Sequence, residues 1–499
     1  MGQYWVALLV TCALAVGTAV SARAEGIDVS VDWDKSVRVS NTTATLQVVV
    51  NPLIRRGSPI HERVFRELKS LGADQVRFVP WMPYPKLAVA ELEPPSETEA
   101  FWDFSLIDPM VEDFFEATAG HSVMLNFSTI PQWMFKTDWH VGYPADPNEA
   151  YWAYEQGTEL RDPTHKELGD YYARVISWYT RGGFVDELGR FRQSGHRFKI
   201  GTWEILNEPD AEHLMSVQQY TERYDAIAAS IREVAPEMRF MGLSLMRPMF
   251  LTSYFEYFLN SSNHRPGTPL DWISYHFYAT TKRGESIESQ VRNLFSQADE
   301  FLKASEEIRA IRDRLSPDTR IAINELGTMR AEDLSNFKDL RSYSDAIPSR
   351  YWNLSAAVYA YAFGELAKSG TDLVGESQLV GFPGQFPSVS MVDWEDGLPN
   401  ARYWVLKLLL DHYAPGDAIM ESASTDSARV YALALVKPNG TRKLLLVNRS
   451  DSPQTVRIPA GINGWFEAVT PSADKPVFGK IPTSRSLDLE GLSVSIVTL

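Results

Sequence analysis

The chain has 499 residues, of which 44% are hydrophobic and 22% charged, a composition typical of a globular protein with one large domain and a small one. Its formal net charge of −16 argues against a nucleic-acid partner, because phosphate binding needs a basic face and no cluster of Lys and Arg supplies one. Aromatic residues make up 12%, more than a core alone usually requires, and sugars stack on such rings.

The first 24 residues have the pattern of a secretory signal peptide. An apolar stretch is followed by Ala22-Arg23-Ala24, a small-residue cleavage pattern. The one cysteine, Cys12, lies inside this segment, so the mature chain is predicted to have no disulfide. We expect a secreted or periplasmic protein of bacterial type. No other apolar run is long enough for a bilayer, so no membrane insertion is predicted.

Strand and helix patterns then alternate over about 350 residues, as in a (β/α)₈ barrel. Apolar residues recur at helical spacing over 60–71, Gly72 ends that helix, and a strand follows at 75–79. The first barrel strand is predicted to end near 46–50. Further strands are predicted at 122–127, 198–205, 239–243, 270–278, 320–325 and 371–380, with helices near 168–179, 220–234, 287–301 and 351–366. Chemistry in such a barrel sits at the carboxyl ends of the strands.

Two of these predicted strands end in a glutamate. Glu208 follows the strand at 198–205 within Asn207-Glu208-Pro209, and Pro209 ends the strand because it has no N–H. An exposed acidic turn is the alternative interpretation. Glu325 ends the strand at 320–325, 117 residues later. By count the two glutamates lie on the fourth and seventh strands. Two carboxylates about 5 Å apart are what a retaining glycosidase needs.

Four segments resemble one family of enzymes: Trp203-Glu204-x-x-Asn207-Glu208-Pro209-Asp210, Ser274-x-His276-x-Tyr278, Asn324-Glu325-Leu326-Gly327, and 400–409 through Pro415-Gly416-Asp417. With them the chain resembles a clan A retaining glycoside hydrolase, most closely family 39, which includes β-xylosidases and α-L-iduronidases. The resemblance implies that Glu208 is the acid/base and Glu325 the nucleophile. Leu326 departs from the Glu-Phe form common in that clan.

Further residues are candidates for contacts in the site. Asn207 is expected to bind a sugar hydroxyl or else to cap the strand end. Arg77 is expected to hold the nucleophile carboxylate or to form a structural ion pair inside the barrel. Tyr278 is expected to donate to Glu325, and His276 either lines the sugar site or is a satisfied core histidine.

Trp394, in the Gly- and Pro-rich loop at 381–399, is predicted to be a platform under the sugar or else a loop anchor. Trp81 and Trp133 follow strands in the same way and are weaker candidates. No metal-binding or phosphate-binding motif is present, so no cofactor and no metal are predicted.

The last part of the chain changes to a β-only pattern. Residues 429–436 and 443–447 flank a turn at Pro438-Asn439-Gly440, which predicts a hairpin. We therefore expect a barrel over 45–415 and a β-sandwich formed by 25–44 with 416–499, after a signal at 1–24. The leading hypothesis is an exported retaining glycosidase acting on an oligosaccharide or polysaccharide, with β-xylosidase as the first candidate. An endo-acting hydrolase of a bacterial exopolysaccharide and a non-catalytic carbohydrate-binding protein are the alternatives, and the oligomeric state is open.

Overall fold

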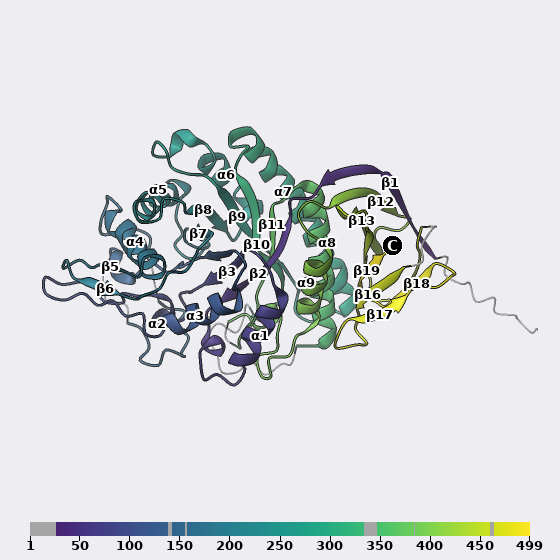
Figure 1. The fold of residues 1–499 in the computed structure, drawn as a ribbon, viewed down its shortest axis with the longest axis horizontal. Helices are drawn as coiled ribbons and strands as arrows, with labels where there is room; N and C mark the ends of the chain where they lie inside the picture. The colour runs from purple at the N-terminus through teal and green to yellow at the C-terminus, as the bar shows by residue number, and fades with distance from the viewer. Residues whose placement is uncertain (1–25, 138–141, 155–156, 334–346, 384, 460–463) are drawn as a thin grey trace, which may run out of the picture.

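The structure is a computed structural model that describes residues 26–137, 142–154, 157–333, 347–383, 385–459 and 464–499. The predicted signal peptide and Cys12 lie outside the described residues. The chain forms two parts: a closed barrel of eight parallel strands and a nine-stranded sheet beside it. Figure 1 shows the barrel on the left and the sheet on the right, with helices α8 and α9 between them. The predicted fold class is confirmed.

The barrel closes in the order β10-β11-β2-β3-β4-β7-β8-β9. Its strands are β2 (Thr43–Val49), β3 (Val76–Val79), β4 (Val123–Leu125), β7 (Thr202–Glu204), β8 (Arg239–Leu245), β9 (Trp272–Thr280), β10 (Arg320–Met329) and β11 (Leu373–Glu376). The predicted count is confirmed, since Glu208 follows the fourth barrel strand and Glu325 lies on the seventh.

Helices cover the outside of the barrel between successive strands. They are α1 (His61–Leu71), α2 (Pro85–Ala88), α3 (Asp108–Ala117), α4 (Lys166–Thr180), α5 (Val217–Val234), α6 (Thr252–Phe258), α7 (Ile287–Leu315), α8 (Ser349–Ser369) and α9 (Ala401–His412). Gly72 ends α1 in the left-handed conformation at φ 61°, which a residue without Cβ adopts at little cost. A small hairpin of β5 (Gly183–Val185) and β6 (Phe191–Gln193) extends the link before β7.

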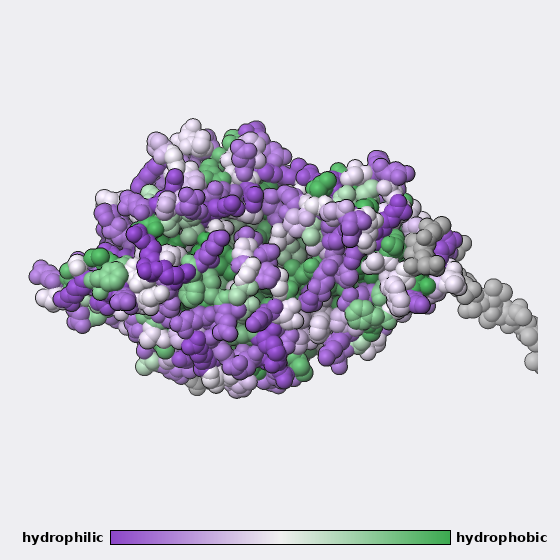
Figure 2. Space-filling view, viewed as in Figure 1, coloured by the Kyte–Doolittle hydropathy of each residue, from purple (hydrophilic) through white to green (hydrophobic). Residues whose placement is uncertain are grey.

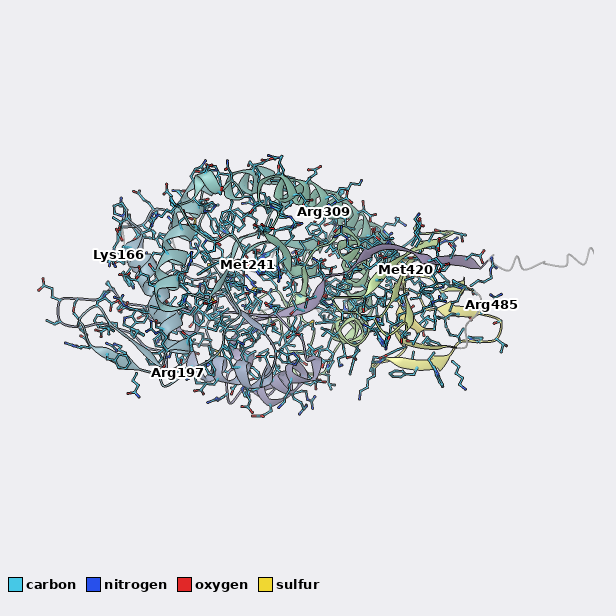
Figure 3. All side chains as sticks on the ribbon, turned by 45° about the horizontal axis from the view of Figure 1, so that its top comes forward. Lys166, Arg197, Met241, Arg309, Met420 and Arg485 are labelled. Atoms are coloured by element: carbon cyan, nitrogen blue, oxygen red, sulfur yellow. The ribbon has the colours of Figure 1, made fainter. Side chains whose placement is uncertain are left out.

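The interior of the barrel is apolar at one end and polar at the other. One residue from each of five strands forms a buried apolar cluster near the strand starts: Met124, Met241, Trp272, Ala322 and Leu373. Met241 marks this region in the middle of the barrel in Figure 3. Because side chains alternate along a strand, the inward residues further along each strand meet in a layer at the carboxyl end. That layer is polar and holds the site described below.

The nine-stranded sheet joins the two ends of the chain. Its strands are β1 (Ile27–Val39), β12 (Ala418–Ser424), β13 (Val430–Val436), β14 (Arg442–Asn448), β15 (Gln454–Arg457), β16 (Trp465–Val469), β17 (Val477–Lys480), β18 (Ser486–Leu489) and β19 (Val494–Thr498). The predicted hairpin is present, with Leu433 opposite Leu445. β1 pairs with β12 along most of its length and with β15 at Ile27 and Asp28, so it connects two groups of strands that share one apolar core.

Close packing and ion pairs fix the sheet against the barrel. Tyr431 of β13 lies so near α8 that a Cβ at Gly364 would meet its hydroxyl oxygen at 2.4 Å, so only glycine fits there. His412 of α9 pairs with Glu467 of β16 at 3.0 Å.

Hydrophilic residues predominate on the face shown in Figure 2, and hydrophobic ones show between them mainly over the barrel. Among the described residues, no helix is both long enough and apolar enough to cross a bilayer.

Candidate active site

A break in the chain after β7 presents Asn207 and Glu208 to one site. β7 stops at Glu204, and both Leu206 (φ 61°) and Glu208 (φ 38°) adopt left-handed backbone conformations that are uncommon outside glycine. The Glu208 N–H then donates to the Ser244 carbonyl at 3.0 Å, which holds the turn against β8. Strain of this kind persists where surrounding contacts enforce it, and it is concentrated at functional sites.

A bulge in β10 turns Glu325 inward. Ile323 pairs with Tyr275 and Glu325 with His276, so Asn324 is an extra residue on this strand. The side chains of Asn324 and Glu325 therefore both point into the barrel. Bulges beside active sites often redirect a side chain in this way. The predicted strand end at Glu325 is wrong: β10 continues to Met329, because the bulge keeps the strand in register with β9 beyond the glutamate.

Arg77 of β3 lies beneath the two glutamates and joins four side chains. Its Nη1 donates to Glu325 at 2.5 Å and to Gln47 at 2.5 Å, its Nε to Glu204 at 2.5 Å, and its Nη2 to Asn207 Oδ1 at 2.7 Å. With 1% of its surface exposed, Arg77 contacts carboxylates rather than solvent. Its contacts with Glu325 and with Glu204 are compatible with both expectations for this residue, a support for the Glu325 carboxylate and a structural ion pair.

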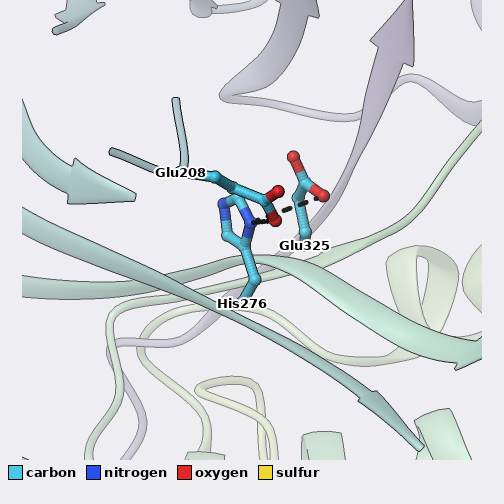
Figure 4. A group of neighbouring side chains, drawn as sticks. All are labelled: Glu208, His276 and Glu325. Carbon is cyan, nitrogen blue, oxygen red and sulfur yellow. Dashed lines mark hydrogen bonds and ion pairs between the residues drawn. The ribbon is translucent and has the colours of Figure 1, made fainter. Parts of the chain in front are cut away.

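His276 and Tyr278 of β9 complete the surroundings of the carboxylates. His276 Nδ1 lies 2.8 Å from Glu208 Oε1 and 3.5 Å from Glu325 Oε2, the two contacts drawn in Figure 4. Its Nε2 lies 2.9 Å from Ser244 Oγ. Tyr278 donates to Glu325 Oε2 at 2.6 Å, as predicted. His276 is fully buried and does not line the cavity described below, so of its two interpretations the satisfied core histidine fits its position.

The two glutamates differ in their proton affinity. One oxygen of each, together with a ring nitrogen of His276, lie within 4.8 Å of one another. Burial raises the pKa of Glu208, and the negative charge of Glu325 acts in the same direction. Burial alone would also raise the pKa of Glu325, but the charges of His276 and Arg77 and the Tyr278 hydrogen bond outweigh it and lower that pKa. Glu208 therefore tends to hold a proton while Glu325 stays ionised.

Glu208, His276 and Glu325 have the residue types of a metal site, but the oxygens of Glu325 are already used in hydrogen bonds. Both oxygens of Glu325 already accept hydrogen bonds, one from Arg77 and one from Tyr278. The Arg77 guanidinium also compensates its charge. A carboxylate held in this way is oriented for attack on a neutral substrate.

A cavity of about 320 Å³ opens above the glutamates. Its floor includes Asn207, Glu208, Glu325 and Tyr278. Its walls combine apolar side chains with polar ones: Val49, Val79, Trp81, Met246, Met329, Phe386 and Val389 with Gln47, Arg247, Thr280, Ser377 and Gln378. Such a volume is near the small end of the roughly 300–1,000 Å³ typical of ligand pockets.

The aromatic wall is not the one that we predicted. Trp394 does not line the cavity; it is partly buried and packs against the barrel core, so the alternative interpretation as a loop anchor fits its position. Trp133 also lies elsewhere, with its Nε1 bonded to the Glu91 carbonyl at 2.9 Å. Trp81, a weaker candidate, forms the wall instead, with Phe386 at 6.2 Å between ring centroids.

Sequence reasoning missed two further carboxylates. Glu204 is fully buried and accepts hydrogen bonds from Arg77, Asn126, Ser274 and Asn324, all at 2.5–2.6 Å. Its signal was a charged residue within an otherwise apolar strand, because a buried charge requires partners. Glu212, four residues after Glu208, contacts both Trp81 and Asn207.

Comparisons with known proteins agree with this geometry. Residues 192–347, which include both glutamates, match the family described as "Glycosyl hydrolases family 39". Residues 427–490 match the "D-apionate lactonase, C-terminal immunoglobulin-like domain". A search of curated proteins gave no match.

Several solved structures share the fold of the whole chain. A GH51 arabinofuranosidase from Xanthomonas axonopodis pv. citri is 13% identical with a TM-score of 0.64, covering 95% of this chain and 99% of that one. A family 51 α-L-arabinofuranosidase from Bifidobacterium longum is 13% identical with a TM-score of 0.65, covering 95% and 98%. A GH30 endoxylanase from Clostridium papyrosolvens C71 is 13% identical with a TM-score of 0.56, covering 94% and 99%. The chain is a glycoside hydrolase with a (β/α)₈ barrel, similar to family 39 over the segment that carries Glu208 and Glu325.

Proposed function

We propose that this protein is a retaining glycosidase that cleaves O-glycosidic bonds by double displacement, with Glu325 as nucleophile and Glu208 as acid/base. The observation that carries the proposal is a pair of carboxyl groups, an oxygen of each lying within 4.8 Å of the other, whose pKa values are displaced in opposite directions. Retaining enzymes place these groups about 5–5.5 Å apart, whereas inverting enzymes leave about 6.5–9.5 Å for a water molecule. The geometry favours the first class.

In the first step, an oxygen of ionised Glu325 attacks the anomeric carbon. The bond to the leaving oxygen breaks while protonated Glu208 donates its proton to that oxygen, and a glycosyl ester forms on Glu325. Arg77 and Tyr278 keep Glu325 in the orientation for attack through their 2.5 Å and 2.6 Å contacts. The second N–H of the Asn207 amide is available to a sugar hydroxyl, in a contact that tightens in the transition state.

In the second step, Glu208 acts as a base. Esterification removes the negative charge of Glu325, which had helped to raise the pKa of Glu208, so Glu208 is then stable as a carboxylate. It takes a proton from water, the water oxygen attacks the anomeric carbon, and the ester bond breaks to release Glu325. Two inversions at one carbon give net retention.

For the substrate we propose a pentoside, with a β-xyloside as first candidate and removal of single sugars from a chain end as the mode of action. The small cavity, with Trp81 and Phe386 among its apolar lining residues, suits a sugar that lacks an exocyclic hydroxymethyl group. Of the three structures compared above, two are described as arabinofuranosidases and one as an endoxylanase, and both names refer to pentose sugars. We further propose that residues 1–24 direct export.

The test combines two substitutions with the stereochemistry of the product. On a panel of aryl glycosides, wild-type enzyme is expected to release the anomer of the same configuration first, as followed by proton NMR. Glu325→Gln should abolish turnover. Glu208→Gln should lower kcat/KM by about 10²–10⁴-fold for poor leaving groups and much less for 2,4-dinitrophenol, which leaves without a proton.

The exposed Glu233 on α5 supplies a matched control, because Glu233→Gln changes the same functional group away from the cavity. Full turnover in Glu325→Gln would refute the assignment. Cleavage of polymers but of no aryl monoglycoside would favour the endo-acting alternative. Binding of xylo-oligosaccharides without any turnover by the wild type would favour the non-catalytic alternative.

A further inference from the structure

Glu212 is a third carboxylate at the site, and the double displacement does not use it. Its backbone N–H donates to the Glu208 carbonyl at 2.8 Å, so one turn of chain positions both glutamates. Its Oε1 accepts two hydrogen bonds, from Trp81 Nε1 and from Asn207 Nδ2, each at 2.7 Å. Its Oε2 is buried and has no hydrogen-bond partner in the described part of the chain.

The contact with Glu212 fixes which way the Asn207 amide points. Asn207 Oδ1 accepts from Arg77 at 2.7 Å and from Ser244 Oγ at 3.1 Å, so the amide oxygen faces into the barrel. One N–H of the amide is donated to Glu212 and the other remains beside the cavity that Asn207 lines. Without Glu212, only the oxygen side of the amide would be anchored.

The same carboxyl group fixes the aromatic wall. Trp81 lines the cavity, and its indole packs edge-on against Trp152 at 5.2 Å and beside Phe386. The Nε1 hydrogen bond to Glu212 adds a directional contact to these ring contacts, and so fixes the angle of the indole. One oxygen of Glu212 thus orients both Asn207, a polar side chain at the cavity, and Trp81, an apolar one.

We propose that Glu212 is a positioning residue that holds the Asn207 amide and the Trp81 indole in their substrate-binding orientations, and that it does so as an uncharged carboxylic acid. The kinetic part of this inference rests on the proposed function. The structural part, the orientation of the two side chains, does not.

The charge state follows from what surrounds Glu212. Burial raises its pKa well above the ordinary value; the negative charge of Glu325 acts in the same direction, as does that of Glu208 whenever Glu208 is ionised. Tyr172, whose own pKa burial raises, also faces it and carries no positive charge. Within the described residues these groups offer Glu212 no compensating cation, so the neutral form is favoured. Neutral Gln reproduces its hydrogen-bond acceptor, whereas Ala removes it.

The kinetic experiment uses Glu212→Gln and Glu212→Ala, with Glu233→Gln as control, on p-nitrophenyl β-xyloside or whichever aryl glycoside the wild type hydrolyses. Glu212→Gln should keep kcat/KM within about tenfold of wild type. Glu212→Ala should lower it by about 10²-fold, because misplaced contacts weaken transition-state binding.

The pH profile separates this role from a purely structural one. If Glu212 is uncharged, Glu212→Gln leaves the alkaline limb of kcat/KM, set by Glu208, where it is. If Glu212 is ionised, removing its charge lowers the pKa of Glu208 and moves that limb to lower pH. A moved limb, or equal losses in the Gln and Ala variants, would overturn the neutral-acid proposal.

A readout without substrate tests the positioning directly. In protein labelled with ¹⁵N-tryptophan, the Trp81 indole resonance is assigned by its absence in Trp81→Phe. It should keep its hydrogen-bonded shift in Glu212→Gln and move upfield in Glu212→Ala. An unmoved resonance in Glu212→Ala would overturn the proposal even in an active enzyme. If no glycoside is hydrolysed by the wild type, the proposed function fails while this measurement still decides the role of Glu212.

Discussion

Replacing Arg77 by Met removes the one guanidinium that lies between Glu204 and Glu325. The side chain of Glu204 is 0% exposed, and that of Glu325 is 10% exposed and reaches only the cavity, so neither charge is well solvated. Breaking a buried ion pair by removing one partner costs about 3–5 kcal/mol, because an uncompensated charge remains. Here two carboxylates lose their partner, and Gln47 and Asn207 lose hydrogen bonds worth about 1 kcal/mol each. We expect a loss of at least about 4 kcal/mol in the free energy of unfolding.

Urea unfolding followed by circular dichroism measures this loss. Adding Glu204→Gln to Arg77→Met should recover part of it, since the double variant leaves one buried unpaired charge instead of two. The pH profile should change as well. Arg77 lowers the pKa of Glu325, so its loss raises that pKa and moves the acid limb of kcat/KM to higher pH.

The pH dependence of the unfolding free energy should also reflect the lowered pKa of Glu325. A carboxyl group whose pKa is lowered by folding stabilises the protein above its unfolded pKa, and that stabilisation is lost as the pH falls through the folded pKa. Arg77→Met should therefore lose part of the pH dependence of unfolding on the acid side. One broken buried ion pair alone should cost more than about 1 kcal/mol. An unfolding free energy within about 1 kcal/mol of wild type, together with an unmoved acid limb of kcat/KM, would therefore refute the reasoning.

Other expectations concern the same site. Activity should follow a bell-shaped pH profile, falling at low pH as Glu325 is protonated and at high pH as Glu208 loses its proton; a profile without an alkaline limb would contradict the acid role. Tyr278→Phe should lower kcat/KM by roughly 10–100-fold, since a hydrogen bond to a charged group is worth about 1.5–3 kcal/mol. Trp81→Ala should raise KM, whereas Trp394→Ala should leave KM unchanged and lower the melting temperature, because only Trp81 lines the cavity; equal effects on KM would contradict this placement.

The order of barrel elements was predictable because it depends on patterns that short segments carry. Apolar runs of strand length alternate with helical spacing, and glycine or proline ends many of them. Counting such units placed Glu208 after the fourth strand and Glu325 on the seventh, as observed. The strand expected to end ahead of Pro209 does so, but it ends earlier and is shorter than predicted: β7 spans Thr202–Glu204 rather than 198–205.

The details of the site depend on tertiary contacts that no local pattern expresses. The bulge at Asn324 depends on how β10 pairs with β9, and without that register Glu325 was taken for a strand end. Trp394 and Trp81 both follow strands in sequence, and only the packing of their loops separates a core contact from a cavity wall. Glu212 lies in a loop after the motif, and its contact with Trp81 appears only when β3 and β7 are both neighbours of β4.

The most direct test of the central claim is intact mass after incubation with 2-deoxy-2-fluoro glycosides, which trap a retaining nucleophile, followed by peptide mapping. The fluorine slows release of the glycosyl ester, so a covalent adduct should accumulate with the xyloside and map to the peptide containing Glu325. An adduct on Glu208 or Glu204, or hydrolysis of the natural linkage with inversion and no adduct, would contradict the assignment of Glu325 as nucleophile.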